Sequence, residues 1–205
     1  MTKNESLIKI IDLAESKPYR KFNEFYNSAL GNNQSPINAI VISSFDNVKT
    51  EVDSRFVNLK YICGDEWTFF SNYSGPKSKQ FRGHDQISAI IYWDSIDVQI
   101  RMKAKIREAN KDLSDQHFKN RSYSKNAIAI SSTQSSNIDS YDSVVKNYEE
   151  TLKTINNSTK RPKYWGGYTF TPYYFEFWEG NKNRINRRQV FEIDNNSWDY
   201  YFLQP

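Results

Sequence analysis

From residue 38 onward the chain is a succession of short runs rich in β-branched and aromatic residues, separated by polar residues and glycine. The runs occupy residues 39–44, 54–62, 67–72, 87–93 and 97–106. Such residues fit the pleated, half-buried surface of a sheet. Because tight connections such as Gly64-Asp65 join antiparallel neighbours, and because there are at least five runs, the pattern favours an antiparallel barrel or sandwich.

Helical spacing of apolar residues marks the segments that flank these strands. We expect two short helices before residue 31, divided by Pro18. Two more are expected at 111–120, capped by Asn110, and at 141–155, where an apolar stripe recurs. The chain then returns to strands at 173–178, 189–193 and 198–203, with a turn at 194–197.

The length of 205 residues suits one compact domain with a substantial core. We therefore predict a single domain that is mainly β with flanking helices, an α+β arrangement. Its expected parts are N-terminal helices at 1–37, barrel strands at 38–110, a helical insertion at 111–160 and C-terminal strands at 161–205.

Charge and composition narrow the possible functions. The 28 basic and 24 acidic residues are mixed along the chain, which argues against a nucleic-acid-binding tail, and the small excess suits a compact anion such as phosphate. Cys63 is the single cysteine, so no internal disulfide is possible. Because neither an apolar signal-peptide core nor a transmembrane run is evident, we expect a cytoplasmic protein.

Several common catalytic signals are missing. The sequence has no Gly-rich phosphate loop and no cysteine pair, and its two histidines, His84 and His117, are too few for a typical metal site. No arrangement for triad chemistry is evident either. If the chain is an enzyme, we expect a bound cofactor to perform the difficult step.

Two neighbouring segments carry residues suited to an anion. Arg55 and Lys60 lie in one predicted strand, on opposite faces unless a bulge intervenes. Ser71 and Lys77 flank a junction where Pro76 can begin a helix, so hydroxyl, amide and ammonium groups can meet a phosphate there. The alternatives are an edge-strand arginine in water and an ordinary solvated loop.

Two later segments are also candidates. The S-T-Q-S-S run at 132–136 offers hydrogen bonds to a polar ligand, or is a plain loop. Trp178 is followed by the spaced arginines Arg184 and Arg188, which suits an apolar wall beside an anion clamp. The alternative is a core tryptophan followed by a basic hairpin.

A series of short pieces occurs in order along residues 19–205. They are R-F-V-N-L-K at 55–60, F-F-S-N at 69–72, Lys77, Gln99, Arg121, Q-S-S at 134–136, W-G-G-Y at 165–168 and E-F-W-x-G-x-x-x-R at 176–184. Although each piece alone has little specificity, the ordered set resembles the pyridoxamine 5'-phosphate oxidase family. The resemblance implies an antiparallel FMN-binding split β-barrel that forms a homodimer and holds FMN in clefts built from both subunits.

The resemblance also assigns residues to roles. The positions that match cofactor contacts are Arg55, Phe56, Val57, Asn58, Leu59, Lys60, Phe70, Ser71, Lys77, Gln99, Gln134, Ser135, Trp178 and Arg188. Of these, Arg55, Ser71 and Lys77 are expected at the FMN phosphate. The substrate-side positions are Lys60, His117, Arg121, Lys125, Arg184 and Asn186, with Arg184 and Asn186 as the catalytic pair. No metal is expected.

In this family pyridoxine or pyridoxamine 5'-phosphate gives a hydride to the flavin, and O2 then takes the electrons. The departures lie mostly on the substrate side. His117 and Lys125 stand where the family has Tyr and Ser, Asn186 replaces a His, and Pro76 replaces an Arg. A basic N-terminal segment that covers the pocket in the family is expected to be absent.

These departures keep two other hypotheses open. One is an FMN-dependent oxidase of a different small substrate, as in the related phenazine-pathway enzymes. The other is a non-catalytic protein that stores FMN or pyridoxal phosphate.

Overall fold

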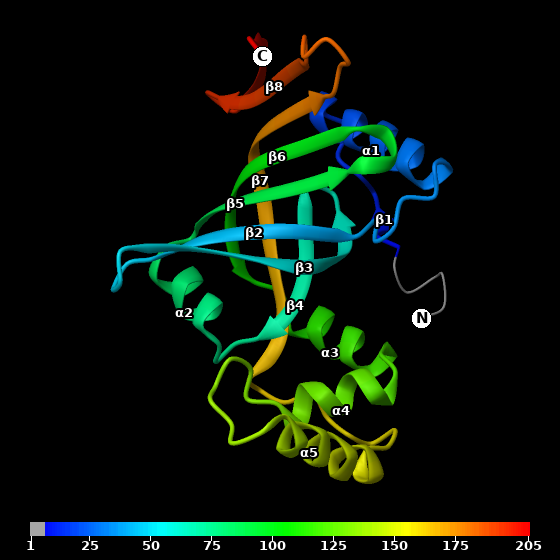
Figure 1. Ribbon diagram of the computed structural model, residues 1–205, viewed down its shortest axis with the longest axis vertical. Coiled ribbons are helices and arrows are strands. Elements are labelled where there is room, and N and C mark those ends of the chain that lie inside the picture. Colours follow the sequence, from blue (N-terminus) through cyan, green and yellow to red (C-terminus); the bar gives the residue numbers. More distant parts are fainter. Residues whose placement is uncertain (1–6) are drawn as a thin grey trace.

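The computed structural model describes residues 7–205 as one large sheet with helices at its sides and one end (Figure 1). The strands are β1 (Lys9–Ile11), β2 (Ala39–Asp46), β3 (Glu51–Cys63), β4 (Glu66–Asn72), β5 (Gln86–Trp93), β6 (Val98–Glu108), β7 (Trp165–Glu179), β8 (Arg187–Asp194) and β9 (Ser197–Leu203). The helices are α1 (Lys17–Gly31), α2 (Pro76–Gly83), the 3-10 turn η2 (Asp94–Ile96), α3 (Lys111–Asn120), α4 (Tyr123–Ser131) and α5 (Tyr141–Thr154).

Six of these strands close into a ring, with antiparallel neighbours throughout. The order around the ring is β3, β4, β7, β6, β5, β2 and back to β3. Closure leaves a barrel without free edges among these strands, except where a strand extends past its neighbour. The predicted antiparallel barrel with flanking helices is therefore confirmed.

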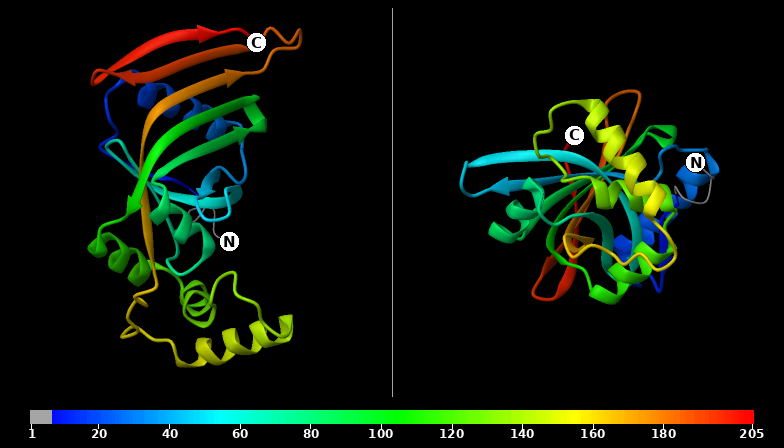
Figure 2. Two further views of the ribbon diagram at one scale, coloured as in Figure 1. Left: turned by 90° about the vertical axis from the view of Figure 1, so that its left-hand side faces the viewer. Right: turned by 90° about the horizontal axis from the view of Figure 1, so that it is seen from below.

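The long strand β7 belongs to two parts of the sheet. Its first half pairs with β4, from Trp165 to Phe170, and its second half pairs with β8 from Tyr174 onward. Between them lies Pro172, which has no N–H to donate to a ladder, and the pairing with β6 shifts register at the same place. The barrel therefore opens here, and β8 and β9 continue away from the helical end of the molecule (Figure 2).

The core is strongly aromatic. Phe22 and Tyr26 of α1 are buried beside the barrel strands, and the Phe22 ring lies 4.5 Å from that of Trp67 at an edge-on angle. Trp93 and Phe175 are fully buried in the same cluster. This packing explains the aromatic richness of the chain, because each ring buries a large apolar area.

The N-terminal prediction of two helices is wrong for the first of them. Residues Lys9–Ile11 form β1, which pairs in parallel with Tyr61–Cys63 of β3. That part of β3 extends beyond the pairing with β2, which ends at Asn58, so an open edge is available for another strand. Pro18 does not divide two helices but lies in the first turn of α1, where a missing N–H costs nothing. Residues 1–6 lie outside the described part.

The predicted helices after the barrel strands are present. Asn110 caps α3, with its side chain accepting a hydrogen bond from the Asp112 amide at 2.8 Å. The stripe on α5 is only partly covered, since Tyr141 remains 79% exposed. The sequence reading missed α4, which packs against α5. The predicted turn is a tight hairpin in which Asn195 and Asn196 both have positive φ.

Among residues 7–205, no helix is long and apolar enough to cross a membrane.

Candidate functional site

A cavity of about 920 Å³ lies where β3 and β4 meet the helices α2, α3 and α4. Most of the predicted site residues line it. They are Arg55, Phe56, Val57, Asn58, Lys60, Phe70, Ser71, Lys77, His117, Arg121, Lys125, Gln134 and Ser135. Chain segments separated by up to 80 positions, from Arg55 to Ser135, therefore converge on one space.

A bulge in β3 brings Arg55 and Lys60 to the same cavity. The register between β3 and β4 shifts between Leu59 and Tyr61, so the alternation of the strand is interrupted there. Leu59 and Ile62 both face the core as a result, and both are completely buried. Lys60 then joins Arg55 in the cavity wall, whereas the Leu59 side chain lies apart from it.

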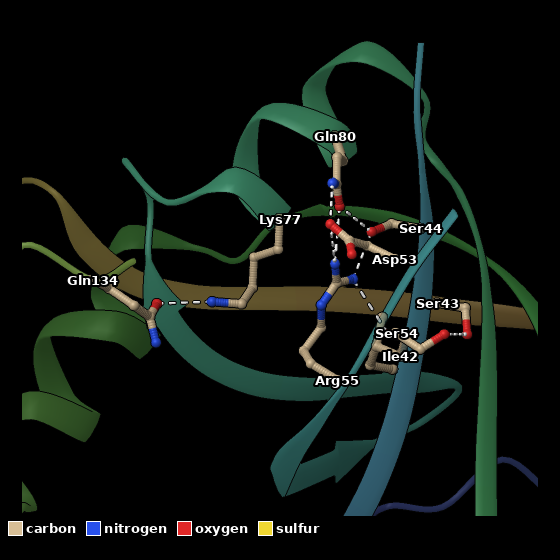
Figure 3. Close-up of polar contacts among 9 residues, drawn as sticks. All are labelled: Ile42, Ser43, Ser44, Asp53, Ser54, Arg55, Lys77, Gln80 and Gln134. Carbon is tan, nitrogen blue, oxygen red and sulfur yellow. Dashed lines mark hydrogen bonds and ion pairs between the residues drawn. The ribbon is translucent and has the colours of Figure 1, made fainter. Parts of the chain in front are cut away.

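One end of the cavity is built around Arg55. Its guanidinium donates to the Ser44 hydroxyl at 2.6 Å and to the Gln80 amide oxygen at 3.0 Å (Figure 3). Asp53 lies 3.5 Å from the same guanidinium and accepts a hydrogen bond from Gln80 at 2.8 Å. Ser44 and Gln80 are buried and hold the arginine in one orientation. The sequence reading missed both, because neither belongs to a recognisable motif.

Lys77 is the second cation at this end. It lies in the first turn of α2, directly after Pro76, and its ammonium donates to Ser71 Oγ at 3.0 Å and to Gln134 Oε1 at 2.7 Å. Burial, together with the nearby charge of Arg55, lowers the pKa of Lys77 to about 8. A buried ammonium held by neutral groups beside a guanidinium is poorly compensated, which favours an anion between them.

The opposite end of the cavity has an aromatic wall. The His117 ring stacks on Phe70 with centroids 3.7 Å apart and planes 8° apart. Trp165 continues the parallel arrangement at 5.5 Å from Phe70, and the Arg121 guanidinium lies 4.5 Å above the Trp165 ring. Trp165 belonged to a recognised sequence piece but was not predicted as a site residue; Tyr61, which also lines the cavity, was not singled out at all.

Positive charge gathers around this wall. Arg121, Lys60 and Lys125 act on His117, and burial with these charges lowers the pKa of the imidazole to about 3. His117 is therefore neutral at physiological pH. Burial also lowers the pKa of Arg121 to about 10, and its guanidinium donates to Asn126 Oδ1 at 3.2 Å. This end is thus a second place suited to an anion.

Leu7 and Lys9 also line the cavity. Lys9 is the first residue of β1, which pairs with β3. Tyr26 of α1 anchors the segment, since its hydroxyl accepts a hydrogen bond from the Ile8 amide at 3.0 Å. The expectation that the family's basic covering segment is absent concerns residues that lie partly outside the described range, so it stays a prediction.

Three predicted cofactor contacts form a separate row outside the cavity. Gln99, Trp178 and Arg188 are register neighbours across β6, β7 and β8. Beside them the buried carboxylate of Glu176 accepts hydrogen bonds from Arg188 Nε at 2.8 Å and from Arg101 at 2.9 Å. Within one chain, none of these three residues lines the cavity.

Arg184 and Asn186 also lie away from the cavity, in the exposed loop between β7 and β8. Arg184 has a positive φ of 60° and its amide bonds to the Asn181 carbonyl at 2.8 Å. Asn186 Oδ1 accepts a hydrogen bond from the Asn181 amide at 3.0 Å. In a single chain, therefore, Asn186 stabilises the loop.

A ring-closed antiparallel sheet continued by a C-terminal hairpin defines a split β-barrel. PhzG from Burkholderia lata 383, solved in complex with tetrahydrophenazine-1-carboxylic acid, superposes with a TM-score of 0.87 at 21% identity over 93% of each chain. A pyridoxamine 5'-phosphate oxidase-related, FMN binding protein from Nostoc punctiforme PCC 73102 superposes with a TM-score of 0.75 at 9% identity, over 93% of this chain and 99% of that one. Both show the same fold.

Sequence comparison identifies the family. Residues 165–205 match the model of the pyridoxine 5'-phosphate oxidase C-terminal dimerisation region. The pyridoxine/pyridoxamine 5'-phosphate oxidase of Rhodopirellula baltica is 30% identical over 199 residues, covering 94% of this chain and 89% of that protein. A pyridoxine/pyridoxamine 5'-phosphate oxidase of Hydrogenovibrio crunogenus is 26% identical, covering 93% and 89%. The chain belongs to the pyridoxine/pyridoxamine 5'-phosphate oxidase family.

Proposed function

We propose that this protein is an FMN-dependent oxidase that converts pyridoxamine or pyridoxine 5'-phosphate to pyridoxal 5'-phosphate, with O2 as the electron acceptor. The observation that carries the proposal is a single cavity lined by two groups of cationic side chains, the second of which gathers around an aromatic wall. One cavity of this kind suits two phosphorylated molecules side by side, a cofactor and a substrate. Family membership supports the same reaction.

The donor set at the first end fits the phosphate of FMN. Arg55, Ser71 and Lys77 supply a guanidinium, a hydroxyl and a buried ammonium to the wall of the same cavity. Charge-assisted hydrogen bonds to phosphate are among the strongest that side chains form. Gln134, already in contact with Lys77, offers an amide at the polar edge of the flavin ring. When bound, FMN supplies the hydride acceptor and passes electrons to O2.

The second end fits the phosphate of the substrate. Arg121 is held by Trp165 and Asn126, so its guanidinium is oriented before a ligand arrives. His117, Lys60 and Lys125 surround the same space. Fixed cations at this point would orient the substrate relative to the cofactor, and orientation of two reactants lowers the barrier of a transfer between them.

A homodimer would complete the site. The matched dimerisation region, 165–205, contains Trp178 and Arg188, which lie outside the cavity of their own chain together with Gln99. We propose that this row, with Arg184 and Asn186, faces the cavity of the partner subunit. We further propose that residues 1–205 act as one domain, with the C-terminal strands completing the partner's site.

The reaction is tested with the purified protein. A yellow protein that consumes O2 when pyridoxamine 5'-phosphate is added would support the proposal. A yellow protein that is inert with both B6 phosphates would contradict the assigned substrate. Only if no other candidate substrate turned over either would a carrier of FMN or pyridoxal phosphate be favoured. A protein that stays free of flavin after incubation with FMN would contradict the cofactor as well.

A second candidate is an oxidase of a different small anionic substrate. The observation that favours it is that His117, Lys125 and Asn186 replace the residues usual at three substrate positions, while the cofactor end keeps most of its matches. Anaerobic mixing with a panel of reduced aromatic acids would test it, with bleaching of the flavin absorbance as the signal. Bleaching by B6 phosphates alone would contradict it.

A further inference from the structure

Tyr61 lies in the cavity wall and contacts the one histidine there. Its hydroxyl is 2.8 Å from His117 Nδ1, and the two rings meet edge-on with centroids 5.4 Å apart. The Tyr61 ring also contacts Phe70 edge-on at 6.0 Å. Its backbone pairs with Lys9 on one side and Thr68 on the other. Strands on both sides therefore hold Tyr61 in place.

His117 is held just as firmly. The stack on Phe70 fixes the plane of the imidazole, and the contact with Tyr61 fixes its rotation within that plane. Because Nδ1 is engaged by Tyr61, Nε2 is the ring nitrogen left to meet a ligand. Tyr61 and Phe70, both far from His117 in the sequence, thus determine which atom the imidazole presents to the cavity.

The charge around His117 decides its protonation state. Arg121, Lys60 and Lys125 act on the ring as like charges, and the ring is shielded from water, so the neutral form is favoured. A neutral imidazole carries one hydrogen, on either Nδ1 or Nε2. The Tyr61 hydroxyl is compatible with both, since it can donate or accept.

A bound anion distinguishes the two forms. With the hydrogen on Nδ1, Nε2 would turn a lone pair toward phosphate oxygens, which are acceptors as well. With the hydrogen on Nε2, the Tyr61 hydroxyl donates to Nδ1 and Nε2–H donates to the anion, so every group is satisfied.

We propose that Tyr61 is a positioning residue that holds His117 as the Nε2–H tautomer, a neutral hydrogen-bond donor to the phosphate of the substrate. The inference rests on the proposed function, in which this end of the cavity binds that phosphate. The pocket then recognises an anion with fixed cations and one neutral donor, and His117 need not change its protonation when the ligand binds.

The test uses the FMN-saturated protein, so that the cofactor end is occupied, with inorganic phosphate as the probe and ¹⁵N-labelled histidine. The chain has two histidines, and His84→Gln assigns the remaining signals to His117. At neutral pH we expect the phosphate-bound protein to show an unprotonated Nδ1 and a protonated Nε2. A protonated Nδ1, alone or as part of an imidazolium, would overturn the proposal.

Tyr61→Phe keeps the ring contacts and removes the hydroxyl. We expect a mixture of tautomers and phosphate affinity lowered about tenfold, equivalent to about 1.4 kcal/mol, because the hydroxyl no longer enforces the donor tautomer. The control is Tyr123→Phe on α4, whose hydroxyl bonds to Asn157 outside the cavity, and it should change neither quantity. An unchanged tautomer and affinity in Tyr61→Phe would contradict the inference.

A double-mutant cycle distinguishes an effect of Tyr61→Phe that acts through His117 from a general disturbance of the structure. In a His117→Gln background, Tyr61→Phe should cause no further loss of phosphate affinity, because its partner is gone. An equal loss in both backgrounds would show that Tyr61 acts independently of His117. Oxygen consumption with pyridoxamine 5'-phosphate is measured on the same samples. If the native protein turns over this substrate but Tyr61→Phe leaves the His117 tautomer unaltered, this inference is refuted while the proposed function stands.

Discussion

The ammonium of Lys77 donates a hydrogen bond to the amide oxygen of Gln134 at 2.7 Å, although the two residues are 57 positions apart. This contact joins the start of α2 to the loop after α4. It places a buried cation, the Ser71 hydroxyl and an amide in one network at the end of the cavity where we propose that the cofactor phosphate binds.

The double substitution Arg55→Ala with Lys77→Ala should weaken FMN binding at least 100-fold, since each charge-assisted hydrogen bond contributes roughly 1.5–3 kcal/mol. Flavin fluorescence quenching measures the affinity. Lys79→Ala, an exposed lysine on the same helix, is the matched control and should leave the affinity unchanged. Unchanged affinity in the double variant would remove Arg55 and Lys77 from the phosphate site.

FMN affinity should also depend on pH through Lys77. Burial and the Arg55 charge lower the pKa of this lysine to about 8 in the free protein, so the ammonium is lost as the pH rises past that value. Affinity should therefore fall above about pH 8 in the native protein. Lys77→Arg should flatten this dependence, because a guanidinium stays charged. A flat profile in the native protein would contradict the assignment.

Acid should destabilise the protein through His117. Burial and neighbouring cations lower the pKa of His117 from 6.5 to about 3, so between these values the unfolded chain binds the extra proton. This contribution to stability is present above pH 6.5 and is lost as the pH falls toward 3. Denaturant unfolding near neutral pH and at mildly acidic pH measures the effect.

His117→Gln should lose less stability on acidification than the native protein does. His84→Gln separates this site from the general effect of losing a histidine. Equal acid sensitivity in the His117→Gln variant and the native protein would exclude His117 as the cause.

Gly167 should not tolerate a side chain. A Cβ there would lie 2.8 Å from the Ala109 Cβ and 3.1 Å from the ring of Phe70, which stacks on His117. Gly167→Ala should lower the free energy of unfolding by about 1–3 kcal/mol, the usual effect of overpacking. Gly31→Ala, where a Cβ meets nothing within 4 Å, is the control and should be neutral or slightly stabilising.

Glu176→Gln should destabilise the protein and loosen Arg188. The carboxylate is buried and binds both Arg101 and Arg188, and breaking a buried ion pair costs on the order of 3–5 kcal/mol. Glu179→Gln is the control, since its ion pairs with Lys21 and Arg187 are long, at 3.7 and 3.9 Å. Chemical denaturation compares the two variants, and equal losses would refute the distinction.

The elements that the sequence predicted are those set by local chemistry. Side-chain type and spacing predicted the barrel strands. Asn110 marked the start of α3, and the Asn195-Asn196 pair marked the turn between β8 and β9. These signals act within a few residues, so they survive without knowledge of the fold. The ordered motifs added the family, and with it most of the residues that line the cavity.

Tertiary structure decided what depends on distant partners. Residues Lys9–Ile11 are a strand because β3 leaves an edge open, and Lys60 faces the cavity because a bulge shifts β3 against β4. Ser44 and Tyr61 acquire their roles only from Arg55 and His117. Such contacts join chain segments far apart in sequence, and backbone pairing and close packing, rather than local preference, determine which atoms meet.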